Sequence, residues 1–498
     1  MPNNIAYHQQ VGDRSELAVY EDRSADSIRL VEYHEMAWLC HSSSMGVLNE
    51  FRWLSKFGPV FGIHGKNVQI ISEPCQFYKT LNSLALESEK RIVLAALYLG
   101  TGALEQNLVQ NIRSAIQNEP HSLQLTVLLD CTRASRGADV SSRTMLTPLI
   151  GEFGPRVQVA LYHSPRLRGL LRWLLPQKWN EIVGLQHIKV YVFDNNVLLS
   201  GANLSDQYFE KRQDRYFLFR DSPELADYYT NLVKSIGRVS FRLDASNQLS
   251  FTNDQDVHPY LHSLGKFVSY SKQLLAEFTE PNDSFDTAGP YDTHVYPLVQ
   301  MSQLQVGNDL IVTTRLLESF TEGSRVKLAT GYFNLIPEYE ELITNGRAAY
   351  DILTAHPKAN SFYEAPGAMY YIPAMYTLLL KMFFTKSAPA RSRVKLWEYE
   401  RKHWTFHGKG LWYYAPGQLR PNLTMIGSPN FGFRSAGRDL ESQVVIVTEN
   451  EDLRNRLEAE QGNIFEPANK VSKQTFEEKE RSVPMWLHIV TKFCRSLF

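Results

Sequence analysis

Two stretches of the chain contain the same chemically active residue types in the same order. The first reads LQHIKVYVFDNNVLLSGANLS and places His187, Lys189 and Asp194 in the spacing HxKxxxxD. Successive side chains of a strand point to opposite faces of a sheet, so His187 and Lys189 share one face. The turn that begins at Asp194 predicts a hairpin that brings Ser200 and Asn203 back beside them. The arrangement predicts a compact anion-binding site.

The second stretch, TFHGKGLWYYAPGQLRPNLTMIGSPNFG, repeats this order with a longer turn. It contains, in sequence, His407, Lys409, Ser428 and Asn430. An acidic residue follows each copy at the same interval, eleven positions after the asparagine: Asp214 in the first copy and Glu441 in the second. We interpret the two copies as the two sides of one site with paired roles.

Histidine pairs of this kind suit phosphodiester transfer. A histidine that attacks phosphorus must be neutral, the non-bridging oxygens need a positive field, and the leaving oxygen or incoming hydroxyl needs a proton carrier. Two histidines and two lysines supply these functions, so we expect no metal and no cofactor to be required. The asparagines would help to hold the phosphoryl oxygens. Asp214 and Glu441 would fix the histidine tautomers, with surface salt-bridge partners as the alternative. Asp194 suits a turn residue better than a catalytic one.

The two hairpins lie in a βα pattern that also occurs twice. RIVLAALYL from Arg91 matches RVKLATGYF from Arg325, and each is followed by a helical pattern. The two HxK histidines are about 220 residues apart, which is the size of a domain. The sequence therefore predicts two similar α/β domains, related by a pseudo-twofold axis, with one shared active site at their interface.

Composition and patterning suggest five segments. We predict an irregular N-terminal segment (1–65), a first domain (66–245), a linker and packing segment (246–300), a second domain (301–465), and a C-terminal tail with an amphipathic membrane-interface helix (466–498). A net charge of −1 argues against nucleic acid as a partner. The four cysteines lack paired spacing and are expected to be reduced thiols. No apolar run reaches the roughly 18 residues that a membrane span requires.

These motifs resemble the phospholipase D superfamily, whose members form one active site from two HxKxxxxD hairpins. One eukaryotic branch of this superfamily transfers a phosphatidyl group from CDP-diacylglycerol to sn-glycerol 3-phosphate and releases CMP. Several segments of this chain are similar to that branch: LLDCTRASRG, GLQHIKVYVFDNNVLLSGANLSDQYFEKRQDRYFLF, and GSPNFGFRS followed by RDLES. The resemblance implies a mitochondrial, inner-membrane-associated enzyme of the pathway to cardiolipin, although the acidic N-terminal sequence is not a typical presequence. One departure is Tyr414, which stands where the second motif has aspartate; we expect activity to survive it.

The resemblance implies that His187 is the nucleophile, forming a phosphatidyl-histidine, and that His407 is the general acid and base; the opposite assignment stays open. Two further groups are weaker candidates. For the nucleotide phosphate these are Tyr98, Gly100, Thr101 and Gly102, with a plain strand-to-helix turn as the alternative. For the acceptor phosphate they are Arg133 and Arg136, with a solvated loop as the alternative.

Two stretches have the mixed apolar and basic character of interfacial helices, RLRGLLRWLLPQKW and VPMWLHIVTKFCRSLF, and packing on the protein's own core is the alternative for each. YIPAMYTLLLKMFF fits a core helix or the wall of an acyl-chain groove.

Three other functions remain: a hydrolase or other phosphodiesterase of the phospholipase D type, a transferase like cardiolipin synthase, and a non-catalytic scaffold. The presence of both histidines and both lysines disfavours the scaffold.

Overall fold

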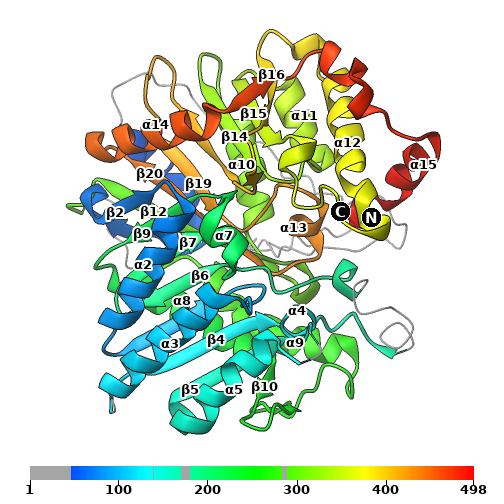
Figure 1. Cartoon of the computed structure of the whole chain (residues 1–498). Coiled ribbons are helices and arrows are strands. Elements are labelled where there is room, and N and C mark those ends of the chain that lie inside the picture. The colour runs from blue at the N-terminus through cyan, green and yellow to red at the C-terminus, as the bar shows by residue number, and fades with distance from the viewer. Residues whose placement is uncertain (1–45, 120, 138, 170–179, 283–288, 498) are drawn as a thin grey trace, which may run out of the picture. The chain divides into compact units, whose positions relative to one another are not determined.

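The computed structural model describes residues 46–497 except 120, 138, 170–179 and 283–288 (Figure 1). The part from Gly46 onward forms one compact unit that contains two large mixed sheets. The stretch RLRGLLRWLLPQKW lies mostly outside the described residues. In the described part of the chain, no helix combines the length and the apolar character that crossing a bilayer would need. Among the described cysteines, Cys75 and Cys494 are free thiols.

The first sheet has nine strands in the order β11-β10-β5-β4-β3-β6-β7-β9-β2. Its centre, β3 to β5, is parallel, and its other neighbours are antiparallel. The strands are β2 (Val68–Ile71), β3 (Arg91–Ala95), β4 (Gln124–Asp130), β5 (Val157–Tyr162), β6 (Val190–Phe193), β7 (Asn196–Ser200), β9 (Tyr216–Phe219), β10 (Phe241–Leu243) and β11 (Leu249–Ser250).

The second sheet follows the order β1-β12-β20-β19-β18-β14-β15-β16-β21, with β13 attached to β12. Its centre, β14 to β16, is again parallel. The strands are β1 (Phe61–Ile63), β12 (Thr293–Met301), β13 (Val306–Gly307), β14 (Arg325–Thr330), β15 (Ala349–Ala355), β16 (Val394–Tyr399), β18 (Gly410–Tyr414), β19 (Leu423–Gly427), β20 (Glu441–Thr448) and β21 (Ala468–Lys470).

The two sheets correspond strand by strand. β3, β4, β5, β6, β7 and β9 occupy the same places in the first sheet as β14, β15, β16, β18, β19 and β20 in the second. Each parallel centre arises because a helix returns the chain to the same edge of the sheet. The predicted fold, two similar α/β domains related by a pseudo-twofold axis, is therefore confirmed.

Both faces of each sheet are covered, which explains why the central strands are almost continuously apolar. On the outer face of the first sheet lie α2 (Pro74–Glu87), α3 (Ala103–Asn118) and α5 (Ser142–Phe153). On that of the second lie α10 (Asp309–Ser319), α11 (Pro337–Asn345) and α12 (Ile372–Lys386). A third apolar cluster contains residues of both sheets together with α8 (Pro223–Arg238), α9 (Leu264–Leu275) and α14 (Glu451–Phe465). This shared core joins the two domains.

The predicted boundaries differ from the structure at two places. Residues 46–65, expected to be irregular, contain α1 (Val47–Glu50) and β1, which pairs with β12 at the edge of the second sheet. The predicted linker 246–300 contains α9 and most of β12, which pairs with β20 along eight residues. The strand escaped prediction because buried polar residues such as Thr293, His294 and Gln300 interrupt its apolar pattern. The second domain thus begins near residue 293.

Candidate active site

The two domains are joined by short strand pairs immediately before each HxK histidine. Gln186 forms a parallel bridge with Leu440, and β17 (Thr405–Phe406) pairs in parallel with β8 (Arg212–Gln213). The backbone NH of His187 donates to the carbonyl of Leu440, and that of His407 to the carbonyl of Gln213, both at 2.8 Å. Each histidine is thereby held against the other domain's acidic residue.

The histidine and carboxylate pairs cross between the domains. Nδ1 of His187 donates to both carboxylate oxygens of Glu441, at 3.0 and 2.9 Å. Nδ1 of His407 donates to Oδ2 of Asp214 at 2.7 Å. An ionised carboxylate only accepts, so each contact favours the tautomer with the proton on Nδ1 and the lone pair on Nε2. At His407 the Nζ atom of Lys409 also lies 2.8 Å from Nδ1.

Both lysines are buried beside these pairs. Nζ of Lys189 donates to the carbonyl of His187 at 2.7 Å, and Nζ of Lys409 donates to the carbonyl of His407 at 2.6 Å. Lys409 also reaches into the first domain, because a Cβ atom at Gly201 would lie 2.9 Å from its Nζ and 2.7 Å from Oδ1 of Asp214. Glycine at this position leaves room for the ammonium group.

The surroundings keep both imidazoles neutral. Burial lowers the pKa of His187, against the opposing field of Glu441. Burial lowers the pKa of His407 much further, and the positive fields of Lys409, Arg212 and Lys189 act in the same direction. His187 also lowers the pKa of His407, so the two rings are electrostatically coupled. Neutral imidazole at pH 7 is the form that a nucleophile or a general base requires.

The lysines and carboxylates are tuned as well. Burial raises the pKa of Asp214 to about 6 and lowers that of Lys409 to about 8. Burial also lowers the pKa of Lys189 well below its usual value. For Glu441 burial alone would raise the pKa, but the field and hydrogen bond of His187 and the field of Lys189 outweigh it and lower the pKa. Asp214 and Lys409 therefore titrate on either side of neutrality.

The two histidines differ in access. The side chain of His187 is 14% exposed, whereas that of His407 is 4% exposed. The Tyr208 ring meets the His407 ring edge-on at 5.1 Å, and its hydroxyl lies 3.4 Å from Nε2. Tyr332 meets the same ring at 5.7 Å. His407 is the enclosed member of the pair.

Sequence reasoning missed Tyr208 and Ser435, which are counterparts in the repeat. Each lies five positions after the asparagine of its hairpin, and each contacts one of the two histidine pairs. The hydroxyl of Ser435 donates to Oε1 of Glu441 at 2.8 Å, whereas Tyr208 contacts His407 directly. Their shared offset in the aligned repeats was the signal that could have found them.

The predicted phosphate-binding serines bind their own backbone instead. Oγ of Ser200 donates to the carbonyl of Arg215 at 2.7 Å, and Oγ of Ser428 donates to that of Ser442 at 3.2 Å. Both serines are fully buried. They tie each hairpin to the residue that follows its acid, Arg215 after Asp214 and Ser442 after Glu441, and Ser428 also interacts with Glu441 itself.

The two asparagines lie closer to the reacting groups. Oδ1 of Asn203 accepts from the backbone NH of Leu97 at 3.2 Å, and its Nδ2 donates to the Tyr208 hydroxyl at 3.2 Å. The backbone NH of Asn430 donates to Ser435, while its Oδ1 is buried without a hydrogen-bond partner among the described residues. The Asn430 amide thus keeps hydrogen-bonding capacity for a ligand.

Asp194, the last residue of the first HxKxxxxD motif and a candidate catalytic residue by its place there, is a turn residue, which is the role that the sequence favoured for it. It lies after β6, at the far end of the strand from His187, with a left-handed φ of 50°. Its carboxylate accepts from the backbone NH groups of Glu89, Lys90 and Arg91 at 2.8 to 3.0 Å. Tyr414, its counterpart, donates to Glu458 at 2.7 Å. Asp194 therefore holds backbone groups at the end of the first hairpin, whereas Tyr414 contacts helix α14.

The Gly100–Thr101–Gly102 loop is closed by the protein's own carboxylate. Glu105 is buried, and its Oε1 accepts from the backbone NH of Asp206 at 2.6 Å. A Cβ atom at Gly100 would overlap this carboxylate. The glycine therefore makes room for Glu105, and the negative charge disfavours a nucleotide phosphate there. The Tyr98 hydroxyl lies 3.2 Å from Oγ of Ser205, a residue that also adjoins Gly100.

Arg133 and Arg136 converge on one acid. Both form ion pairs with Glu181, that of Arg133 at 3.5 Å. The Arg133 guanidinium also lies 4.6 Å from the centre of the Tyr98 ring. Asp130 caps the short helix α4 (Cys131–Ala134) and accepts from the backbone NH of Gln186, next to His187. The two arginines are therefore tied to the edge of the site.

One cluster of possible metal ligands occurs in the described part of the chain: His187, Asp439 and Glu441, whose ligand atoms lie within 4.8 Å of one another. Asp439 already accepts from Arg434 at 2.9 and 3.0 Å and from the backbone NH of Leu185 at 3.0 Å. Glu441 accepts from His187 and Ser435. Because both carboxylates already accept these hydrogen bonds, we interpret the cluster as one that positions His187 and not as a metal site.

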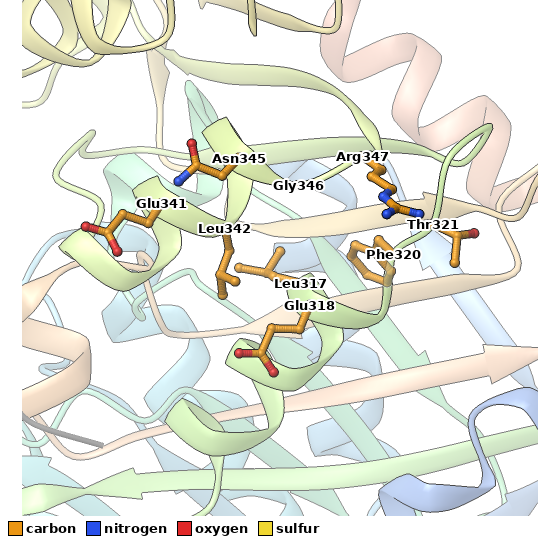
Figure 2. A pocket seen from close by; sticks show the side chains of 9 residues that line it. All are labelled: Leu317, Glu318, Phe320, Thr321, Glu341, Leu342, Asn345, Gly346 and Arg347. Atoms are coloured by element: carbon orange, nitrogen blue, oxygen red, sulfur yellow. The ribbon is translucent and has the colours of Figure 1, made fainter. Parts of the chain in front are cut away.

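A surface pocket of about 530 Å³ lies elsewhere, between α10 and α11 (Figure 2). Phe320 and Thr321 precede β14, and Arg347 precedes β15, so the pocket borders the first residues of these strands. Tyr332, beside His407, follows the last residue of β14. The pocket and the histidines are thus at opposite ends of the second domain's strands.

The chain is similar to several proteins of known name. It is 42% identical over 482 residues to the human protein named CDP-diacylglycerol–glycerol-3-phosphate 3-phosphatidyltransferase, mitochondrial, covering 91% of this chain and 86% of that protein. It is 33% identical over 462 residues to the Saccharomyces cerevisiae protein of the same enzyme name, covering 86% of this chain and 88% of that protein.

Among solved structures, phosphatidylserine synthase of Haemophilus influenzae matches with a TM-score of 0.73 and 20% identity, covering 91% of this chain and all of that one. This likeness supports the fold alone. Sequence identity at this level does not show a shared function. No family model matches the chain.

Proposed function

The chain belongs to the family of CDP-diacylglycerol–glycerol-3-phosphate 3-phosphatidyltransferases, and from that premise we propose how its two crossed pairs carry out the reaction. The enzyme transfers the phosphatidyl group of CDP-diacylglycerol to sn-glycerol 3-phosphate. Its products are phosphatidylglycerophosphate and CMP. One observation supports the mechanism. Two neutral imidazoles, each hydrogen-bonded to a carboxylate of the other domain, lie within the electrostatic field of the same two lysines.

In the first half-reaction Nε2 of His187 attacks the phosphorus atom that carries the diacylglycerol. The P–N bond forms, the P–O bond to CMP breaks, and CMP leaves with the bonding electron pair. Glu441 stabilises the positive charge that develops on the ring through the proton on Nδ1. Lys189 and Lys409 stabilise the negative charge on the non-bridging oxygens. CMP leaves as a weakly basic phosphate, so this step needs little protonation.

In the second half-reaction the primary hydroxyl of glycerol 3-phosphate attacks the phosphatidyl-histidine. Nε2 of His407 accepts the hydroxyl proton, and Asp214 stabilises the resulting imidazolium. The P–N bond breaks and its electron pair returns to His187, which becomes neutral again. The greater exposure of His187 supports its role as the nucleophile, because the nucleophile must reach the phosphorus of a large lipid.

We propose further that neither half-reaction requires a metal or a cofactor. The two buried lysines supply the positive charge that neutralises the phosphoryl oxygens, a role that a metal fills in other phosphoryl-transfer sites. The carboxylates nearest to His187 already accept hydrogen bonds from Ser435 and Arg434. Added chelator should therefore leave turnover unchanged.

Arg133 and Arg136 are our candidates for binding the acceptor phosphate. Both lie at the edge of the site and share a single acid, Glu181. Two guanidinium groups on one carboxylate leave positive charge for a dianionic phosphate. Changing either arginine to glutamine should raise the KM for glycerol 3-phosphate more than it lowers kcat.

The lipid donor implies that the enzyme works at a membrane surface. The human relative is named mitochondrial, and we extend that location, at the inner membrane, to this chain. We expect peripheral contact, because no helix within the described ranges meets the requirements for a span.

Purified protein incubated with CDP-diacylglycerol, with and without glycerol 3-phosphate, tests the function. We expect phosphatidylglycerophosphate and CMP in equal amounts only when the acceptor is present. Phosphatidic acid formed at the same rate without acceptor would indicate a hydrolase. No CMP release under either condition would contradict a catalytic role and favour a scaffold.

A further inference from the structure

The C-terminal helix α15 (Met485–Cys494) exposes most of its apolar side chains. Met485 is 80% exposed and Phe493 is 79% exposed, and Trp486 and Ile489 are exposed as well. Only Leu487 and Thr491 are buried. Met485, Ile489 and Phe493 are four residues apart and therefore lie along one side of the helix. We call Met485, Trp486, Ile489 and Phe493 the α15 face.

The α15 face continues onto the neighbouring 3-10 helix Gly367–Tyr371. The Tyr371 ring meets Trp486 edge-on at 4.9 Å and meets Tyr370 at 5.4 Å. Tyr370 is also exposed. Single exposed apolar residues are ordinary on protein surfaces, but a contiguous group of this size marks an interaction surface. Trp and Tyr are the residues enriched where membrane meets water.

Helices α12 and α15 themselves carry charge of one sign, although exposed acids such as Glu364 and Glu480 lie in the segments that precede them. Helices α12 and α15, which pack together (Figure 1), contain no aspartate or glutamate. Lys381 of α12 and Lys492 of α15 are exposed. Bulky apolar and aromatic side chains flanked by lysine suit an anionic lipid surface.

Two aromatic contacts lead from α12, the helix on which α15 packs, to the active site. Tyr376 of α12 stacks on Tyr332 with ring centres 5.4 Å apart, and Tyr332 meets the His407 ring at 5.7 Å. Arg495, just after α15, donates to Oδ1 of Asn334 at 3.1 Å and to the carbonyl of Leu335 at 2.8 Å. The helix on which α15 packs thus supplies part of the wall near His407.

We propose that the α15 face and Tyr370 insert into the interface of an anionic bilayer, and that the lipid donor reaches the histidines from that side along α12. The inference rests on the proposed function, since a donor with two acyl chains resides in a bilayer. It identifies which surface of the protein meets the membrane. A second copy of the chain is the competing occupant, and the charge argues against it, because two α15 faces would bring lysines together.

The test uses the double variant I489D/F493D and a matched control, L86D/L419D, which makes the same chemical change at two exposed leucines elsewhere. Binding to vesicles of phosphatidylcholine and phosphatidylglycerol is measured by co-sedimentation. We expect I489D/F493D to lower the partition coefficient by about 100-fold and the control to leave it within about threefold of wild type. Equal binding of I489D/F493D and wild type would overturn the proposal, as would a wild-type dimer that this variant converts to monomer.

Activity with two donors separates the membrane surface from the chemistry. With CDP-diacylglycerol in vesicles, I489D/F493D should lose activity in parallel with binding. With a short-chain, water-soluble CDP-diacylglycerol it should match wild type, because Ile489 and Phe493 lie outside the catalytic groups. An equal loss on both donors would contradict the proposal. If wild type transferred phosphatidyl from neither donor, the proposed function would fail, and the vesicle result would still decide the surface.

Discussion

Asp214 accepts a hydrogen bond at 2.7 Å from Nδ1 of His407, a residue of the other domain. The reciprocal contact joins His187 to Glu441. Each domain thus supplies the histidine of one pair and the carboxylate of the other. Neither domain contains a complete pair, so the active site exists only when both domains are packed together.

The crossed pairs predict that substitutions of the two residues in one pair have non-additive effects on activity. Asp214→Asn keeps the size of the side chain but can stabilise the wrong His407 tautomer, and we expect kcat/KM to fall by about 10³ to 10⁴. The double variant D214N/H407A should be no worse than H407A alone, because both changes disable one pair. Asp227→Asn, which alters an exposed ion pair, is the control. Additive losses in the double variant would show that Asp214 acts independently of His407.

The pH dependence should be bell-shaped. Asp214, with a pKa of about 6, is an acceptor for His407 only when ionised, so kcat/KM should fall as pH decreases below about 6. Lys409, with a pKa of about 8, is positive only when protonated, so kcat/KM should fall as pH rises above about 8. A profile of kcat/KM measured at limiting donor concentration checks both limbs. A flat profile from pH 5 to 9 would refute these assignments.

Asp194 should matter for stability and not for chemistry. Asp194→Ala removes the acceptor for three backbone NH groups, and we expect the free energy of unfolding to fall by about 2 kcal/mol. At a temperature where the variant is folded, kcat should stay within about twofold of wild type. Urea denaturation and initial rates measure the two quantities. A large loss of kcat in the folded variant would contradict this account and indicate a catalytic role for Asp194.

The sequence was informative where the pattern is local and repeated. Strand alternation and the matched spacing of two HxK motifs predicted two α/β domains with one site, and each asparagine led eleven residues on to its acid. The sequence did not show that the pairs cross between the domains, because spacing along the chain associates each acid with the histidine of its own repeat: Asp214 with His187, and Glu441 with His407. It arises from the bridges of Gln186 with Leu440 and of β17 with β8, which are tertiary contacts.

Prediction failed where a buried side chain took the place of a ligand. The Gly100 loop had the features of a phosphate site, but the side chain of Glu105, in the first turn of α3, occupies it. Ser200 and Ser428 looked like ligand-binding hydroxyls, yet each donates to the buried backbone carbonyl of the residue that follows Asp214 or Glu441. Buried backbone groups need partners, and nearby serines are the residues that supply them.

A buried ion pair next to Asp214 joins the two domains and should stabilise their packing. Arg215 and Glu460 are almost fully buried and form two contacts, at 2.7 and 3.0 Å, and the Arg215 guanidinium lies 3.9 Å from the Trp412 ring. Arg215→Met would leave Glu460 buried without its cation, and we expect a loss of about 3 to 5 kcal/mol in the free energy of unfolding.

The double variant R215M/E460M tests whether the unpaired charge causes this loss. It should recover at least half of the lost stability, because both charges are removed. Arg420→Met, which breaks an exposed pair with Glu451, should change stability by less than about 1 kcal/mol. If the double variant were as unstable as Arg215→Met, lost packing and not the buried charge would explain the effect.

The stereochemistry at phosphorus tests the covalent mechanism most directly. CDP-diacylglycerol made chiral at the phosphatidyl phosphorus, by sulfur substitution of one non-bridging oxygen, is converted with glycerol 3-phosphate, and the configuration of the product is determined. Attack by His187 followed by attack of the glycerol hydroxyl inverts phosphorus twice, so we predict overall retention. Inversion in the product would mean direct displacement by glycerol 3-phosphate and would contradict the phosphatidyl-histidine.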